Sequence, residues 1–233
     1  TTKACRTGRH WPCLSGITGS GKRRNLLEAL FEQLRRLRLL PVVRLEEAAA
    51  ALPLAEALAA GGLPAAEITF RTPAAADAIR LIAGRMPAVC ILAGTVLTVE
   101  QARAAVEAGA RGIVSPGTNP DVVAWCMNHG VPVIPGCATP SEVEACIRMG
   151  LGIVKLFPAE VLGGVAMLRA LAGPYGQMRF MPTGGIGERN LAAYLKEPNV
   201  LCCGGSWMVP SDALKSGDFA RIRTLTAQAA ACL

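Results

Sequence analysis

The chain has 233 residues, of which 52% are hydrophobic and 4% aromatic, and its net charge is +7. This length and apolar content suffice for one sizeable core, and no apolar stretch reaches the roughly 18 uninterrupted residues that a membrane span needs. Residues 1–24 carry +6 of this charge, so the remaining residues are nearly neutral. With few aromatic residues as well, they lack the basic, aromatic-rich face that nucleic acid requires. We therefore expect a soluble domain with neither a membrane nor a nucleic-acid partner.

Residues 1–24 are predicted to form a basic, disordered or loosely packed extension. They lack the apolar core of a secretory signal. Gly16, Gly21 and Lys22 have the spacing of a phosphate-binding loop, but Arg23 stands where the Ser or Thr that binds magnesium is required, and no strand precedes the motif. We therefore treat the match as chance and place the folded domain at residues 25–233.

From Asn25 onward, β-like runs alternate with helical patterns. A leucine-rich helix at about 25–37 is followed by eight β/α units, which favour a single-domain (β/α)8 TIM barrel with the first helix capping one end. The predicted strands are 41–45, 65–70, 88–93, 112–115, 131–134, 152–156, 178–181 and 199–203. The predicted helices between and after them are 47–60, 74–85, 98–109, 119–129, 140–149, 164–172, 188–196 and 217–231.

Glu67 lies inside the second predicted strand, where an inward-facing carboxylate is costly unless it is paired or takes part in chemistry. A buried ion pair with Arg71 or Lys155 explains it as well as a general acid/base role does. The residue alone does not decide between these interpretations.

Lys155 lies in the apolar run at residues 152–158, on the sixth predicted strand. An unpaired ammonium is costly to bury, burial favours the neutral form of an amine, and a neutral lysine beside a carbonyl compound forms a Schiff base. In a TIM barrel the chemistry gathers at the carboxyl ends of the strands. We therefore expect Lys155 and Glu67 to face the same pocket.

Glycine-rich turns follow the last two predicted strands, at Thr183-Gly184-Gly185 and at Gly204-Gly205-Ser206. Backbone N–H groups that no side chain obstructs suit a phosphate dianion, and phosphate sites of TIM barrels recur after strands seven and eight. The alternative is that these glycines only make tight turns. Two such turns at the expected strands favour a phosphate site.

Histidine and cysteine usage gives little support for a metal site. The two histidines, His10 and His129, lie far apart in the sequence, and the nine cysteines include no Cys-x-x-Cys pair. Scattered reduced thiols fit a cytoplasmic enzyme. We expect no metal and no cofactor.

Seven ordered segments, 67–72, 93–97, 115–117, 135–142, 155–160, 182–186 and 204–207, resemble the 2-keto-3-deoxy-6-phosphogluconate (KDPG) aldolases. Members of that family often also cleave 4-hydroxy-2-oxoglutarate. The resemblance runs from about residue 26 to the C-terminus. Among its departures, Cys137-Ala138 stand where members often have Ile-Ser, and Phe70 stands where they often have Leu; neither change removes a functional group.

The resemblance implies a class I aldolase in which Lys155 holds pyruvate as an iminium and Glu67 moves protons. It also implies that the substrate is a phosphorylated keto acid and that the enzyme is a cytoplasmic homotrimer. Arg71 and Thr95 would hold the pyruvate carboxylate, and Pro116 and Phe157 would form apolar walls. The implied phosphate contacts are Thr183, Gly184, Gly185, Gly205 and Ser206.

Three alternatives remain open at this point. An aldolase for the 6-phosphogalactonate isomer would share the same motifs. A non-catalytic phosphate-binding barrel would contain Lys155 and Glu67 as a buried ion pair. A metal-dependent aldolase is disfavoured by the shortage of ligands.

Overall fold

The computed structural model describes the backbone of residues 20–233 and the side chains of residues 27–233. The expected extension at 1–19 lies outside the described residues. Helix α1 (Ser20–Leu37) begins earlier than the predicted domain boundary at Asn25, so Lys22 and Arg23 of the chance phosphate-loop match are helical. The prediction of a leucine-rich first helix is confirmed, with a corrected start.

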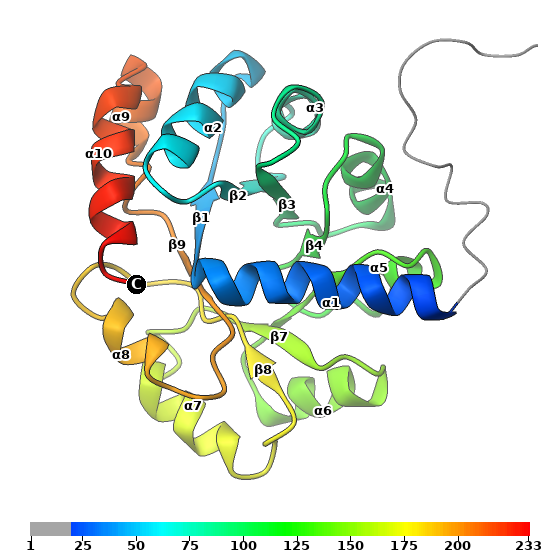
Figure 1. Ribbon diagram of the computed structural model, residues 1–233. Helices are drawn as coiled ribbons and strands as arrows, with labels where there is room; N and C mark the ends of the chain where they lie inside the picture. Colours follow the sequence, from blue (N-terminus) through cyan, green and yellow to red (C-terminus); the bar gives the residue numbers. More distant parts are fainter. Residues whose placement is uncertain (1–19) are drawn as a thin grey trace, which may run out of the picture.

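Parallel strands alternate with helices along the rest of the chain (Figure 1). The strands are β1 (Leu39–Val43), β2 (Ala65–Thr69), β3 (Cys90–Gly94), β4 (Ile113–Val114), β5 (Val133–Ile134), β6 (Gly136–Cys137), β7 (Ile153–Leu156), β8 (Arg179–Phe180) and β9 (Cys203–Gly205). The helices after α1 are α2 (Ala51–Ala60), α3 (Ala75–Arg85), α4 (Val99–Glu107), α5 (Pro120–Asn128), α6 (Pro140–Arg148), α7 (Gly164–Ala172), α8 (Leu191–Leu195), α9 (Ser211–Ser216) and α10 (Phe219–Ala230), with a 3-10 turn at Ala48–Ala50.

The strands form a curled parallel sheet in two hydrogen-bonded parts. One part has the order β5-β4-β3-β2-β1-β9 and the other β6-β7-β8. Two isolated parallel bridges, Phe180 with Val200 and Thr183 with Gly204, link the region of β8 to that of β9. The helices lie around the outside of the strands (Figure 1).

The fifth predicted strand, 131–134, ends as β5, and Pro135 separates it from a further short strand, β6. Proline has no backbone N–H to donate to a sheet ladder. Its carbonyl still accepts the Lys155 N–H at 2.8 Å. The break therefore lies directly beside the lysine strand.

Two predicted strand ends are corrected by the structure. β1 begins and ends two residues before the predicted 41–45, and β9 contains Gly204 and Gly205, which we had placed in the loop after the strand. A Cβ at Gly204 would overlap the Thr183 side chain, and one at Gly205 would overlap the Trp207 ring. Glycine inside a strand commonly marks such a close approach.

Several helices begin at side chains that cap their first turn. The Thr98 and Asn119 side chains accept backbone N–H groups of α4 and α5, respectively. Thr139 and Glu142 form a reciprocal capping box at α6. These local sequences fix where each helix starts, close to the predicted position.

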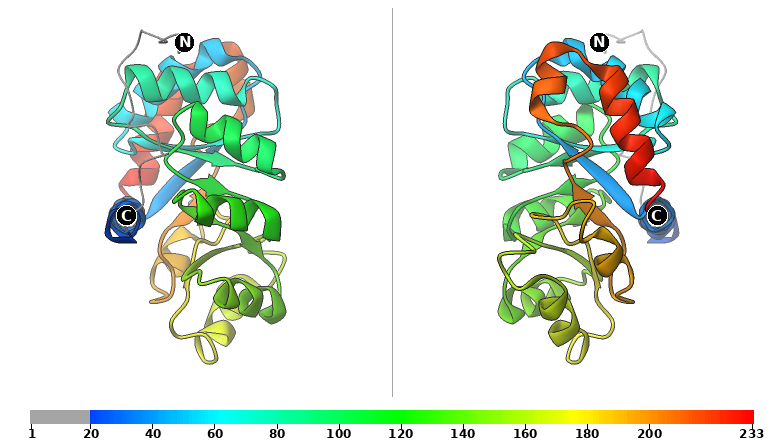
Figure 2. Two further views of the ribbon diagram at one scale, coloured as in Figure 1. Left: turned by 90° about the vertical axis from the view of Figure 1, so that its right-hand side faces the viewer. Right: turned by 90° about the vertical axis from the view of Figure 1, so that its left-hand side faces the viewer.

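α1 covers one end of the strands and is seen end-on in both side views (Figure 2). Its buried Leu30 and Leu34 pack into an apolar cluster inside the strands that also contains Leu92, Met181 and Cys202. Burying such leucines contributes about 1.5–3 kcal/mol each. The helix closes the amino-terminal end of the strands, which leaves their carboxyl ends for a site.

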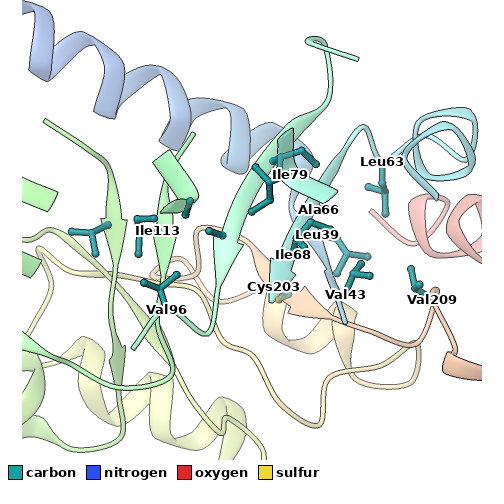
Figure 3. Packing of buried hydrophobic residues seen from close by; sticks show 14 of the residues in the cluster. Leu39, Val43, Leu63, Ala66, Ile68, Ile79, Val96, Ile113, Cys203 and Val209 are labelled. Carbon is teal, nitrogen blue, oxygen red and sulfur yellow. The ribbon is translucent and has the colours of Figure 1, made fainter. Parts of the chain in front are cut away.

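A larger apolar cluster fills the space between the strands and the surrounding helices. Leu39 and Val43 of β1, Ile68 of β2 and Cys203 of β9 pack together in this layer (Figure 3). The last residue is held nearby, because the Arg38 guanidinium donates to the Leu233 carbonyl. In the described part of the chain, no helix is both long and apolar enough to cross a membrane.

Candidate active site

Lys155 and Glu67 meet between the strands, far apart in sequence but close in space. Lys155 Nζ lies 3.2 Å from Glu67 Oε1, and the exposed fractions of the two side chains are 5% and 0%. Lys155 comes from β7 and Glu67 from β2. The expectation that these two residues share one site is met.

The position of Glu67 depends on a glycine on the next strand. Thr69 of β2 pairs with Gly94 of β3, and a Cβ at Gly94 would overlap the Glu67 carboxylate. The glycine therefore makes the room in which the carboxylate turns toward Lys155. The sequence alone does not indicate this role, which only the strand register reveals.

One oxygen of Glu67 is unpaired. Among the described residues, the buried Oε2 has no hydrogen-bond partner, whereas Oε1 accepts from Lys155. Leaving a buried acceptor unsatisfied costs about 1–3 kcal/mol, and more for a charged group. A pair retained for stability alone would be expected to satisfy both oxygens, so the free Oε2 favours a site for a substrate hydroxyl or a water molecule.

The floor beneath the pair is apolar. Leu92, Met181 and Cys202 are completely buried in the cluster that α1 closes. Burial chiefly, and the nearby Cys203 and Glu67, raise the pKa of the Cys202 thiol. Water is thereby excluded from one side of Lys155 and Glu67, which strengthens electrostatic interactions between them.

Phe157 covers Lys155 from the end of β7. The lysine Nζ lies 5.3 Å from the centre of the Phe157 ring, and the peptide bond from Phe157 to Pro158 is cis. This distance is within the range of a cation–π contact. The structure thus places the predicted apolar wall beside the amine.

Pro116 lies against β6, the strand that pairs with the lysine strand. Gly136 pairs in register with Lys155, and a Cβ at Gly136 would overlap the Pro116 carbonyl. The buried Ser115 holds this turn, because its hydroxyl donates to the Gly117 carbonyl at 2.7 Å. The turn that carries Pro116 therefore packs directly against Gly136, the residue that pairs with Lys155 on the next strand.

Thr95 and Arg71 follow the ends of β3 and β2. Thr95 is half-buried with a φ of 55°, a left-handed conformation that is uncommon for threonine, next to the glycine that makes room for Glu67. Arg71 is exposed, and its side chain has no ion pair or hydrogen bond within the described part of the chain. Its guanidinium is free to bind a carboxylate.

The turn after β8 presents unpaired backbone N–H groups. Gly184 and Gly185 have φ values of 100° and 78°, which glycine adopts without strain. Within the described residues, the N–H groups of Gly184, Gly185 and Ile186 donate no hydrogen bond. Free amides at the start of a turn are the donors that a phosphate needs.

The turns after β8 and β9 lie together. The buried Thr183 forms a parallel bridge with Gly204, so the Gly184-Gly185 turn is next to the end of β9. Ser206 follows β9 and is exposed, whereas Gly205 lies within the strand and is covered by Trp207. The structure brings Thr183, Gly184, Gly185 and Ser206 together at the carboxyl ends of β8 and β9. Gly205 is the last residue of β9.

Sequence reasoning missed the side chains that hold the glycine turn in place. Glu160 packs on Gly185, where a Cβ would overlap it, and its carboxylate accepts a hydrogen bond from the Tyr194 hydroxyl. Asn190 donates to the Gly185 carbonyl at 3.0 Å and accepts from the Gly187 N–H at 2.8 Å. Glu160 ends the segment that begins with Lys155, but no sequence pattern indicates Tyr194 as its partner.

In the portion with described side chains, no three His, Cys, Asp or Glu residues converge as a potential metal site. His129 ends α5 and stacks on Trp125, with its Nδ1 at 2.7 Å from the Trp125 carbonyl. His129 is the C-cap residue of this helix, a position that suits histidine.

Comparison with known proteins gives concordant results. The family model of KDPG and KHG aldolases matches residues 30–225. The chain is 54% identical over 199 residues to the 2-dehydro-3-deoxy-phosphogluconate aldolase of Treponema pallidum, which covers 85% of this chain and 95% of that protein. It is 46% identical to the KHG/KDPG aldolase of Escherichia coli, over 81% of this chain and 89% of that protein.

A solved structure of high similarity is that of the KDPG aldolase of Legionella pneumophila, with pyruvate captured as a covalent carbinolamine intermediate. The two chains superpose with a TM-score of 0.80 at 42% identity, over 82% of this chain and 93% of the other. The segment that the family model matches, residues 30–225, includes the strands that carry Glu67 and Lys155. The chain belongs to the KDPG and KHG aldolase family.

Proposed function

We propose that this protein is a class I aldolase that cleaves 2-keto-3-deoxy-6-phosphogluconate to pyruvate and D-glyceraldehyde 3-phosphate. The same site would cleave 4-hydroxy-2-oxoglutarate to pyruvate and glyoxylate. The observation that carries this proposal is the buried Lys155 amine, 3.2 Å from a carboxylate whose second oxygen is unpaired in the described part of the chain. This arrangement supplies a nucleophile and a proton carrier at one carbonyl carbon.

In the first half of the reaction, Glu67 takes a proton from Lys155 across the 3.2 Å contact, which leaves a neutral amine. The amine attacks the C2 carbonyl of the substrate and forms a carbinolamine. Glu67 then returns its proton to the C2 hydroxyl, which leaves as water and produces the iminium. The iminium withdraws electrons from the C3–C4 bond.

In the second half, the Glu67 carboxylate accepts the proton of the C4 hydroxyl as the C3–C4 bond breaks. The aldehyde product leaves, and the electrons of the broken bond form an enamine on Lys155. Glu67 protonates C3 of this enamine, and attack of water on the resulting iminium releases pyruvate and regenerates the amine. We assign these transfers to Oε2, which has no partner among the described residues, whereas Oε1 accepts from Lys155.

The remaining residues would orient the substrate. Arg71, with a planar fork of donors, and Thr95 would hold the pyruvate carboxylate. Phe157 and Pro116 would keep bulk water from the amine. The phosphate would lie on the free amides of the turn after β8 and on the end of β9, through Thr183, Gly184, Gly185, Gly205 and Ser206.

For the fold, we propose that the strands close into an eight-stranded (β/α)8 barrel, with β5 and β6 sharing one strand position. The bridges of Phe180 with Val200 and Thr183 with Gly204 support this closure. The resemblance to the family supports a homotrimer, and the free cysteines support a cytoplasmic location. We propose a single folded domain at residues 25–233. Its first helix, α1, begins before this range, at Ser20.

A steady-state comparison of three substrates tests the proposal. The reduced, full-length chain is assayed with the phosphogluconate-derived keto acid, its phosphogalactonate isomer and unphosphorylated 4-hydroxy-2-oxoglutarate. We expect the highest kcat/KM for the phosphogluconate derivative. Higher activity on the galactonate isomer would instead support the sister aldolase, and absence of cleavage of all three would contradict an aldolase.

A parallel assay with EDTA addresses metal-dependent cleavage. A Schiff-base mechanism on Lys155 predicts unchanged kcat after chelation. Loss of activity that zinc restores would overturn the proposed mechanism, because the amine would then not be sufficient as the electron sink.

A further inference from the structure

Two cysteines lie in contact beside the lysine strand. Cys137 ends β6, Cys146 lies on α6, and their sulfur atoms are 3.6 Å apart. Both side chains are buried. The Thr118 hydroxyl lies 3.7 Å from the Cys137 sulfur and 3.5 Å from the Cys146 sulfur. Neither thiol takes part in the proposed cleavage.

The other buried cysteines are poorly suited to react. Burial raises the pKa of the Cys126 thiol to about 12, and burial, opposed by Arg111, raises that of Cys90 to about 11. Cys202 and Cys203 are neighbours in sequence, so their side chains point to opposite faces. Among the described residues, none of these four cysteines has a sulfur–sulfur contact like that of Cys137 with Cys146.

The contact itself activates one member of the pair. A hydrogen bond from Cys137 lowers the pKa of the Cys146 thiol, against the opposing effect of burial. The thiolate is the nucleophilic form of cysteine. A nucleophile and a second thiol that can resolve its oxidised form therefore stand within contact distance.

We propose that Cys137 and Cys146 form a reversible oxidation site, at which a small hydroperoxide converts the two thiols into a disulfide that joins β6 to α6. The Cys146 thiolate attacks one peroxide oxygen, the O–O bond breaks, and sulfenic acid and water form once the leaving oxygen is protonated. Cys137 then attacks the sulfenic sulfur and releases the second water. The two thiols together lose two protons and two electrons, which reduce one molecule of hydrogen peroxide to two water molecules.

The burial of both sulfurs selects the oxidant. Hydrogen peroxide is comparable in size to water, whereas a peptide disulfide would have to displace the residues that cover the pair. The chemical class that fits is therefore a small hydroperoxide. The reaction needs no other group from the protein.

The pair is connected to the catalytic lysine by the sheet. Cys137 pairs in register with Leu156, Gly136 pairs with Lys155, and the Phe157 N–H donates to the Cys137 carbonyl at 3.2 Å. Forming the bond shortens the sulfur distance from 3.6 Å to about 2.05 Å. We expect β6 to absorb part of this shift and to move the Lys155 amine relative to Glu67.

The experiment uses the full chain with Cys5, Cys13 and Cys232 replaced by serine, which removes cysteines that could form cross-links between molecules. The protein is treated with hydrogen peroxide, alkylated, digested and analysed by mass spectrometry. We expect a peptide pair that links residues 137 and 146 and has lost two hydrogen masses, and its disappearance with dithiothreitol. Cys126→Ala is the matched control for a buried cysteine and should leave the link intact, whereas Cys146→Ala should abolish it.

The second readout is activity and rests on the proposed function. We expect kcat to fall on oxidation by up to about 10²-fold, as for a small displacement of a catalytic group, and to recover with dithiothreitol. The Cys146→Ala protein should keep its kcat after peroxide. Absence of the 137–146 link, or a linked protein with unchanged kcat, overturns the proposal. If the reduced protein shows no cleavage at all, the proposed function fails, while the mass measurement still reports on the disulfide.

Discussion

Glu67 and Glu197 each pair with a cation, and the two pairs differ in what surrounds them. Glu67 meets Lys155 between the strands, where the exposed fractions of the side chains are 0% and 5%. Glu197 meets Arg169 of α7 on the outside, where the arginine side chain is 69% exposed. The outer carboxylate oxygen accepts from Arg169 Nε at 3.0 Å and from Nη2 at 2.7 Å.

The difference separates a structural pair from a reactive one. Arg169 keeps most of its hydration and gives the nearly buried Glu197 a partner, so this pair fastens α7 to the segment before β9. Lys155 and Glu67 give up their hydration entirely, and within the described part of the chain one Glu67 oxygen gains no partner in return. Such a costly arrangement is expected where chemistry requires it.

The largest expected effect comes from Lys155→Ala. Removing the amine removes the covalent intermediate, so kcat/KM for the phosphorylated substrate should fall by more than about 10⁴-fold, beyond what loss of a general acid/base gives. Steady-state kinetics and circular dichroism together check this result. Substantial cleavage by a folded Lys155→Ala protein would place the chemistry elsewhere.

The next effect is that of Glu67→Gln, which keeps the size of the side chain and removes its ability to carry protons. We expect kcat to fall by about 10²- to 10⁴-fold, with slow formation of the Schiff base preserved. Glu197→Gln is the matched variant on the outer pair and should leave kcat unchanged. If Glu67→Gln unfolds the protein but leaves the activity of each folded molecule intact, the inner pair is structural as well.

A smaller effect is expected at the phosphate turn, where the Glu160 carboxylate accepts from the buried Tyr194. Tyr194→Phe removes that hydrogen bond while keeping the ring, so the turn at Gly185 loses part of its support. We expect KM for the phosphorylated substrate to rise about 2- to 10-fold, the range for one hydrogen bond, and KM for 4-hydroxy-2-oxoglutarate to stay the same. An equal rise for both substrates would indicate a general loss of packing.

The smallest effect is on stability at the outer pair. Glu197→Gln should lower Tm by no more than a few degrees, because the exposed Arg169 cation regains its hydration when its charged partner is lost. Thermal unfolding followed by circular dichroism checks this. A large loss of stability would show that the outer pair, despite its exposure, carries as much of the fold as the core does.

The sequence revealed the residues whose chemistry conflicts with their surroundings. Lys155 and Glu67 interrupt apolar strands, so each stood out alone, and the alternation of strands and helices gave the parallel architecture. The glycines at 204 and 205 were misplaced, because a glycine pair is typical of a turn and only the packing of Thr183 and Trp207 shows why a strand needs them.

Apart from that of Lys155 with Glu67, contacts between distant segments could not be predicted. The support of Glu160 by Tyr194, the space that Gly94 makes for Glu67 and the contact of Cys137 with Cys146 each depend on the register of neighbouring elements. No local pattern encodes such a register. The same holds for the interruption between β5 and β6, since the sequence placed Pro135 after the end of a strand and did not show that its carbonyl would hold the lysine strand.

Reduction with borohydride in the presence of pyruvate tests the central claim most directly. The protein is incubated with pyruvate, reduced, digested and mapped by mass spectrometry, with Glu197→Gln as a folded control. The account predicts a reduced pyruvyl adduct on Lys155 in the wild-type and control proteins, a slower adduct in Glu67→Gln and none in Lys155→Ala. Absence of the adduct on Lys155 in the folded wild-type protein would contradict it and leave Lys155 and Glu67 as a buried ion pair.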